Sequence, residues 1–104
     1  MKNVKIIVIT INRLNSQKQP YKKNYVVIYY NEEIYAYNFL GGEWVVKTML
    51  KNHVEDTKIL INTNEELDLK NFEIKLRKKE TRTNAYILGE LESLKTRIKY
   101  DRSK

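Results

Sequence analysis

The chain opens with a nearly continuous apolar run, VKIIVITI at residues 4–11, in which β-branched side chains predominate. Such a run predicts a strand that is buried on both faces of a sheet. A second run, TKILIN at residues 57–62, has the same pattern. We therefore expect these two segments to form the central strands.

Two further runs, YVVIYY at residues 25–30 and IYAYNF at residues 34–39, are rich in tyrosine and β-branched residues. The polar link NEE at residues 31–33 indicates a β-hairpin between them. The register of this hairpin is open by one residue, and a slip would exchange the tyrosines that face the core. Residues 12–24, which include the only proline, are predicted to form a polar loop.

A fifth strand is predicted late in the chain. In FEIKLRK (72–78), Phe72, Ile74 and Leu76 alternate with charged residues, which is typical of a half-buried strand at the edge of a sheet. The preceding residues, 64–71, are expected to form a short helix or turn.

Apolar residues recur at helical spacing in two places, within residues 43–53 and in a last helix that begins at about Asn84. The apolar positions are Val45, Val46, Met49 and Leu50 in the first helix and Ile87, Leu91, Leu94 and Ile98 in the last. The final residues, 99–104, are expected to fray.

These elements predict an α+β fold in a single domain, residues 1–104, with the succession β-β-β-α-β-(short α)-β-α. A right-handed crossover through the helix at 43–53 would place the fourth strand parallel to the first. With the alternating strands outermost, the predicted architecture is a five-stranded mixed sheet with strand order 3-2-1-4-5.

This succession resembles the ribonuclease-H-like fold, in topology only and over almost the whole chain. The resemblance implies a site in which carboxylates from the first and fourth strands and from the first and last helices hold two divalent ions. Only Glu43 stands near such a position, because residues 4–11 contain no acid and the fourth strand ends in the neutral residues 62–64. Glu65 and Glu66 follow, where acids favour a helix N-terminus. We therefore expect no enzyme activity, no metal site and no cofactor; the alternative is another small α+β sheet that has no metal site.

The composition is typical of a soluble domain, since 41% of the 104 residues are hydrophobic and 32% are charged. No apolar run approaches the roughly 18 residues that mark a membrane span, and the first residues are unlike a signal peptide. The lack of cysteine is compatible with a reducing compartment. We expect a cytoplasmic protein with no membrane partner. The abundance of Lys, Ile and Asn suggests an AT-rich genome, such as that of a phage or mobile element.

The net charge of +7 is distributed unevenly, with +6 in residues 1–23, −5 in residues 24–74 and +6 in residues 75–104. If the two basic segments fold onto one side, they form a positive face that attracts polyanions. The predicted phosphate contacts are Lys18, Lys22 and Lys23 in the loop, Lys75, Arg77, Lys78, Lys79 and Arg82 at and after the fifth strand, and Lys95, Arg97 and Lys99 on the last helix.

Four tyrosines, Tyr21, Tyr29, Tyr35 and Tyr37, are candidates for stacking on bases if a sheet face is open. The competing interpretation is ordinary sheet packing, because tyrosine is common in strands. His53, the only histidine, fits a partly buried structural position better than a catalytic one.

The sequence thus predicts a small non-catalytic protein that holds the phosphate backbone of DNA or RNA with a basic face. The alternative is a phage or mobile-element protein that binds and inhibits a host nucleic-acid enzyme or defence protein; a degenerate ribonuclease-H-like nuclease is third. A nucleic-acid binder must keep the acids of the middle block away from its contact face, whereas an inhibitor can use both signs of charge. These acids are Glu32, Glu33, Glu65, Glu66 and Asp68.

Overall fold

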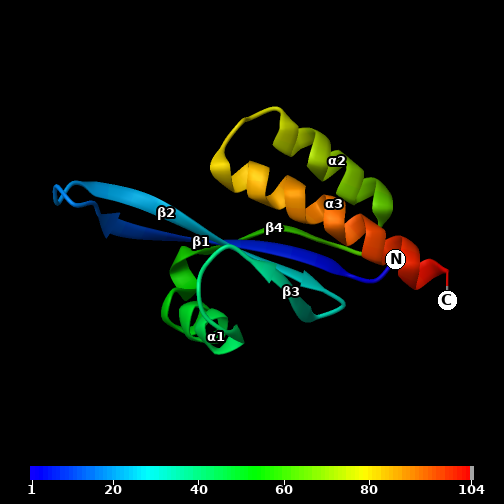
Figure 1. Cartoon of the computed structure of the whole chain (residues 1–104), viewed down its shortest axis with the longest axis horizontal. Helices are drawn as coiled ribbons and strands as arrows, with labels where there is room; N and C mark the ends of the chain where they lie inside the picture. The colour runs from blue at the N-terminus through cyan, green and yellow to red at the C-terminus, as the bar shows by residue number, and fades with distance from the viewer. Residues whose placement is uncertain (104) are drawn as a thin grey trace.

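A computed structural model describes residues 1–103 of the chain (Figure 1). The elements are β1 (Val4–Leu14), β2 (Pro20–Tyr30), β3 (Glu33–Tyr37), α1 (Glu43–Asn52), the short 3-10 helix η1 (Val54–Asp56), β4 (Thr57–Thr63), α2 (Glu66–Arg77) and α3 (Arg82–Arg102). The α+β class and the single sheet of the sequence analysis are therefore present, with three α-helices and four strands in the described residues.

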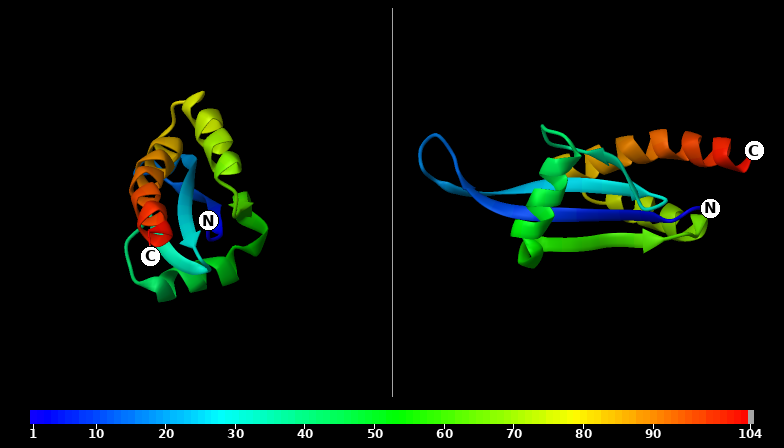
Figure 2. Two further views of the ribbon diagram at one scale, coloured as in Figure 1. Left: turned by 90° about the vertical axis from the view of Figure 1, so that its right-hand side faces the viewer. Right: turned by 90° about the horizontal axis from the view of Figure 1, so that it is seen from below.

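The sheet has the order β3-β2-β1-β4, and each neighbouring pair is antiparallel. Helices α2 and α3 lie side by side on one face of the sheet, while α1 lies across the other face (Figure 2). The molecule therefore has three layers, and neither sheet face is left open over the core.

The main core lies between the sheet and the pair α2 and α3. Even-numbered side chains of β1 and β2 point to this side because successive residues of a strand alternate between faces. Four apolar residues of α3 meet them, and the predicted apolar stripe of the last helix is confirmed. The core residues are Val4, Ile6, Val8, Val26 and Ile28 of the sheet and Ile87, Leu91, Leu94 and Ile98 of α3. A smaller core on the other face joins Ile7 and Val27 to Val46 of α1.

The predicted fifth strand is wrong, because most of residues 72–78 belongs to helix α2. Leu69, Glu73 and Leu76 are the buried positions of α2, and their spacing is helical. The central buried position is occupied by an acid, Glu73, so the helical pattern of apolar residues is interrupted there. The apolar residues that remain nearby, Phe72, Ile74 and Leu76, alternate with polar ones as in a strand. Ile74 lies on the exposed side, with 53% of its surface accessible.

The predicted mixed sheet is also wrong, because β4 runs antiparallel to β1. The chain passes through α1 and η1 and enters β4 with Thr57 opposite Ile9, so the strand runs back toward Val4. β4 is moreover an edge strand and not a central one, and Ile59 is 56% exposed. The parallel crossover expected from the sequence is therefore absent.

The pairing of β2 with β3 fixes the hairpin register that the sequence left open. Tyr30 pairs with Glu33 and Tyr29 with Ile34, and a register shift follows at Ile28. The two residues of the turn, Asn31 and Glu32, have positive φ angles of 54° and 67°. Both values suit the tight turn that joins twisted antiparallel strands.

Two further segments differ from expectation. Residues 12–24 are not a loop but the distal half of the β1–β2 hairpin, since β1 extends to Leu14 and β2 begins at Pro20. At the other end of the chain, α3 continues through residues 99–102, which we expected to fray. Lys104 lies outside the described residues.

Candidate nucleic-acid interface

A two-stranded arm, residues 10–24, extends beyond the sheet (Figure 1). The last residue of β1 that pairs with β4 is Ile9, whereas the pairs of β1 with β2 continue without a break to Leu14 opposite Pro20. Every residue from 12 to 24 is exposed. The arm is therefore a ribbon that is held by its own ladder and packs on little else.

The tip of the arm is ordered by one side chain. The Asn15 Oδ1 atom accepts hydrogen bonds from the backbone N–H groups of Gln17 and Gln19, both at 2.9 Å. The backbone N–H of Lys18 donates to the Asn15 carbonyl at 2.9 Å, and Lys18 itself has a φ angle of 59°. This turn chemistry closes the ribbon at a defined position.

At the base of the arm, cations of both strands surround one aromatic ring. Arg13 donates a hydrogen bond of 2.7 Å to the Tyr25 hydroxyl, and its guanidinium lies 5.9 Å from the ring centroid. The ammonium of Lys23 lies 5.4 Å from the same ring. Arg13 was not among the predicted contacts, although its position in an acid-free basic segment is a signal that the sequence contains.

The second basic segment, residues 75–82, forms the end of α2 and the turn into α3. The turn is held by Asn84, whose side-chain amide donates to the carbonyls of Leu76 (3.3 Å) and Lys79 (2.9 Å). Thr81 caps α3 by accepting a hydrogen bond of 3.0 Å from the Asn84 backbone N–H. These bonds fix the backbone that carries Lys78 and Lys79.

The segment 75–82 lies beside the base of the arm, about midway along the molecule, and the arm tip extends away from it (Figure 1). The Asn24 amide on the arm donates to the Thr83 hydroxyl at the start of α3, at 3.4 Å. We define the basic end as the exposed cations of these two segments that form no ion pair within residues 1–103. They are Arg13, Lys18, Lys22 and Lys23 on the arm and Lys75, Lys78, Lys79 and Arg82 on the segment 75–82.

The cations of the basic end have few acidic neighbours. Within residues 1–103, none of the eight forms an ion pair, and Glu80 is the only acid in residues 10–24 and 75–82. Because like charges repel when no anion lies between them, such a cluster favours a polyanionic partner. The structure thus places the first two predicted basic clusters beside each other, except that Arg77 pairs with Glu92.

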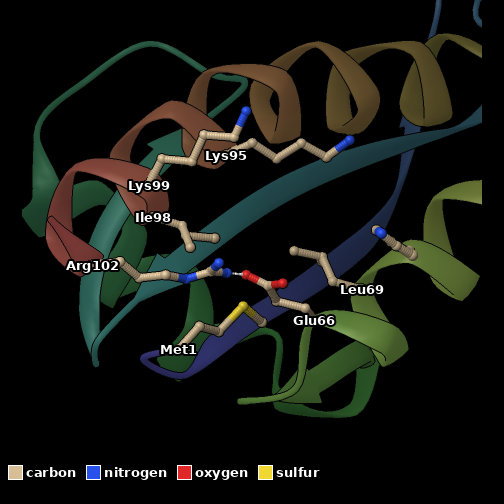
Figure 3. Close-up of a pocket in the computed structure, with 8 residues that line it drawn as sticks. Met1, Glu66, Leu69, Lys95, Ile98, Lys99 and Arg102 are labelled. Carbon is tan, nitrogen blue, oxygen red and sulfur yellow. Dashed lines mark ion pairs between the residues drawn. The ribbon is translucent and has the colours of Figure 1, made fainter.

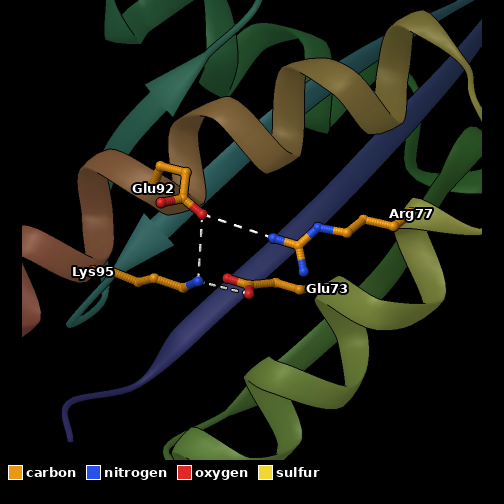
Figure 4. A network of polar contacts seen from close by, with 4 residues as sticks. All are labelled: Glu73, Arg77, Glu92 and Lys95. Atoms are coloured by element: carbon orange, nitrogen blue, oxygen red, sulfur yellow. Dashed lines mark hydrogen bonds and ion pairs between the residues drawn. The ribbon is translucent and has the colours of Figure 1, made fainter.

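The third predicted cluster, on α3, is placed differently. Lys95 lies about 20 Å along the helix from Arg82, at 1.5 Å per residue. Its ammonium contacts the Glu73 carboxylate at 2.7 Å and the Glu92 carboxylate at 3.4 Å (Figure 4). Glu92 also lies 3.8 Å from Arg77. These ion pairs join α2 to α3. Lys95 has a structural function because its partner Glu73 is buried, whereas the pair of Arg77 with Glu92 is exposed and contributes little to stability.

Glu73 explains the geometry of this network. Its side chain is 4% exposed, and its Oε1 atom has no hydrogen-bond partner among residues 1–103. Lys95 supplies the counter-charge for this buried carboxylate. The hydrogen bond to Glu73 is the main cause that raises the pKa of Lys95 above its ordinary value. The ion pair with Glu73 therefore favours the charged form of Lys95.

Near the end of α3, Asp101 contacts one tyrosine and two cations. It accepts a hydrogen bond of 2.6 Å from the Tyr30 hydroxyl and lies 3.5 Å from Arg97 and 3.8 Å from Lys2. The hydrogen bond from Tyr30 is the largest influence that lowers the pKa of Asp101. Burial, with Asp101 as a neighbour, raises the pKa of Tyr30 to about 12.

A cavity of about 340 Å³ lies between the ends of α2 and α3, with Leu69 and Ile98 on its apolar side (Figure 3). Arg102 and Glu66 form an ion pair across it, and Lys99 stands beside them. The predicted contact Lys99 thus lies far along α3 from the basic end, on the lining of this cavity.

Three of the four candidate stacking tyrosines are used in packing. The Tyr35 hydroxyl is 2.7 Å from Ser93 of α3, and the Tyr37 hydroxyl donates to the Gly41 carbonyl at 2.6 Å. Tyr29 packs beneath α1 with the Lys5 ammonium 4.7 Å from its ring. Tyr21 on the arm is the exception, since it is 42% exposed.

The acids of the middle block lie at the end opposite to the arm. Val4 pairs with both Tyr30 and Thr63, so the β2–β3 turn and the start of α2 are at the end where β1 begins. The acids placed there are Glu32, Glu33, Glu65, Glu66 and Asp68. Two others, Glu55 and Asp56, precede β4 nearer the base of the arm, where Asp56 lies 3.3 Å from His53.

The acids form no candidate metal site in the part of the chain that the structure describes. Among residues 1–103, no three carboxylate or histidine side chains lie close enough together to hold a metal ion. Every helix in the same residues is too short or too polar to span a bilayer. Comparison with protein families, with curated proteins and with solved structures finds no match for this chain.

Proposed function

We propose that this protein is a non-catalytic nucleic-acid-binding protein that holds the phosphate backbone with its basic end. The observation that carries the proposal is that eight exposed cations, which form no ion pair within residues 1–103, lie on two segments that are distant in the sequence and meet at the contact of Asn24 with Thr83. Lysine and arginine contacts to phosphates release counterions, which supplies most of the affinity for any nucleic acid.

The distribution of acids supports the same proposal. Glu32, Glu33 and the acids that begin α2 lie at the far end, so a polyanion at the arm meets little repulsion. Three cations at that far end pair with acids, Arg102 with Glu66 and both Lys2 and Arg97 with Asp101. The molecule is thereby polarised, and its field orients the basic end toward a polyanion.

The test compares two triple variants with the same change of charge. Lys78→Glu, Lys79→Glu and Arg82→Glu change the basic end; Lys47→Glu, Lys70→Glu and Lys99→Glu change exposed lysines elsewhere. Fluorescence anisotropy with labelled DNA and RNA, titrated with salt, measures affinity. The first variant should lose binding and lower the magnitude of the log–log salt slope by about 0.7–0.9 per phosphate contact removed. Equal loss in both variants, or no binding of the parent to any nucleic acid at low salt, overturns the proposal.

A second candidate function is inhibition of a nucleic-acid enzyme or defence protein by direct binding. Leu40 and Trp44, at the start of α1, are 95% and 71% exposed, and large apolar side chains in such positions favour a protein partner. The basic end would then occupy the partner's nucleic-acid-facing surface. Replacing Leu40 and Trp44 with serine should abolish capture of that partner and leave nucleic-acid binding unchanged.

A further inference from the structure

The arm is a preformed projection before any partner arrives. Its five distal residue pairs, from Thr10 opposite Asn24 to Leu14 opposite Pro20, extend roughly 17 Å at about 3.3 Å per residue. The Asn15 turn closes the tip, and the Thr10 hydroxyl donates to the Asn24 side chain across the base at 2.8 Å. A preformed ribbon loses little conformational entropy when it binds.

The dimensions of the arm select among nucleic-acid shapes. Neighbouring strands lie about 4.8 Å apart, so a ribbon with its side chains fits the major groove of B-form DNA, which is about 12 Å wide and 8.5 Å deep. The minor groove, at about 6 Å, is too narrow for it. The major groove of an RNA duplex is deep but too narrow for side chains to read.

Single strands are a poorer match to this surface. Proteins that bind them present several aromatic rings along an open groove. Here both sheet faces are covered by helices, and Tyr29, Tyr35 and Tyr37 are engaged in packing. Tyr21 alone would remain for stacking from the four candidates.

We propose that the arm enters the major groove of double-stranded DNA while the segment 75–82 holds the flanking phosphates. This inference rests on the proposed function and adds the type of nucleic acid and the groove. The strand alternation places Asn12, Lys22 and Asn24 on the side of the arm that faces α3, with Asn24 bonded to Thr83. Asn12 and Lys22 pair with each other in the ladder, and both side-chain types contact base edges in the major groove.

The experiment uses dimethyl sulfate, which methylates guanine N7 in the major groove and adenine N3 in the minor groove. The parent protein is bound to a DNA duplex, and its affinities for the same sequence as single-stranded DNA and as an RNA duplex are measured at equal salt. We expect protection of guanine N7 and at least about tenfold tighter binding to the DNA duplex, the effect of one good base-edge contact.

A shortened variant isolates the arm. Replacing residues 13–21 with Asn-Gly joins Asn12 to Lys22 by a two-residue hairpin turn and keeps the register. It should retain weak, salt-sensitive binding through the segment 75–82, with a smaller preference for the DNA duplex and weaker N7 protection. Asn12→Ala with Lys22→Ala in the full-length arm provides a second measurement that does not depend on the folding of a shortened chain, and N7 protection should weaken in it.

The outcomes separate the inference from the proposed function. Protection of adenine N3 alone, equal affinity for the RNA duplex, or unchanged N7 protection in the shortened variant overturns the major-groove inference while nucleic-acid binding stands. If the parent binds none of the three probes at low salt, both proposals fail.

Discussion

The two ends of the helical layer carry the same kinds of side chain with different consequences. At the basic end, Lys78, Lys79 and Arg82 are exposed and form no ion pair within residues 1–103. Farther along α3, Lys95 and Arg97 each contact a carboxylate. The number of cations on an element therefore does not identify a binding surface. Their partners do, because a cation that neutralises a buried acid stabilises the fold and is less available to a phosphate.

The largest expected effect concerns packing, in a comparison of α3 with the arm. Leu91 of α3 is fully buried in the main core, whereas Leu14 on the arm is 64% exposed. Leu91→Ala should lower the free energy of unfolding by about 2–5 kcal/mol, since it removes buried contacts and leaves a cavity. The matched change Leu14→Ala should stay within about 0.5 kcal/mol. Urea denaturation measures both, and similar midpoints for the two variants would show that α3 is not docked on the sheet.

The next effect compares two lysines of the helical layer. Lys95→Met leaves the Glu73 carboxylate buried without its counter-charge and should cost about 1–3 kcal/mol, less than a fully buried pair because Lys95 is 36% exposed. Lys79→Met should leave the midpoint unchanged and weaken nucleic-acid binding.

Adding Glu73→Gln to Lys95→Met should restore part of the lost stability, because the buried carboxylate is then neutral. Thermal denaturation of the two single variants and the double variant provides the measurement. If Lys95→Met weakens nucleic-acid binding as strongly as Lys79→Met does, the division between structural and binding cations is wrong.

A smaller effect is expected at the arm tip. Asn15→Ala removes the acceptor for two backbone N–H groups and should loosen the turn by about 1 kcal/mol locally. Amide hydrogen exchange should accelerate in residues 15–19 and remain unchanged in the core strands. Asn71→Ala, at an exposed position of α2, is the control. Faster exchange in Ile6 and Ile28 would contradict an arm that opens independently of the sheet.

The smallest effect is the pH dependence at the far end of α3. The folded state lowers the pKa of Asp101, so its contribution is present above the ordinary carboxyl pKa of 3.8 and is lost as pH falls through the lower folded value. The melting temperature of the parent should exceed that of Asp101→Asn at neutral pH, and the two should converge in acid. Glu55→Gln, at an exposed position, should show no such change. A constant gap down to the lowest pH would assign the effect to something other than ionisation.

The sequence predicts much of the sheet but not its limits. Apolar runs identified β1, β2, β3 and β4, and the order of these four strands agrees with the prediction. The burial pattern does not determine strand direction, so the antiparallel entry of β4 was missed. Helix α2 was missed because Glu73 occupies one of its buried positions. A buried acid is stable there only because it pairs with Lys95 of α3, which the sequence does not indicate.

The candidate interface was predicted in part for a related reason. Basic residues of the arm and of the segment 75–82 stand close together in the sequence and could be grouped from it. The arm itself has no hydrophobic alternation, since a ribbon without a core on either face needs none. It was therefore predicted as a loop, and Arg13 was missed. The ion pairs of Lys95 and Arg97 depend on neighbours that only the fold supplies.

The unbroken pairing of β1 with β2 also has a kinetic consequence. The pairs at the arm tip join residues that are close in the chain, whereas Val4 and Thr63 are separated by more than half of it. Closing the short loop costs less entropy, and hairpins form on the order of 1–10 μs, so the ribbon should zip from Asn15 toward the core. β4 and the helices would then add to strands already in register. The segment that reaches farthest into solvent would thus be the one that starts the folding of the sheet.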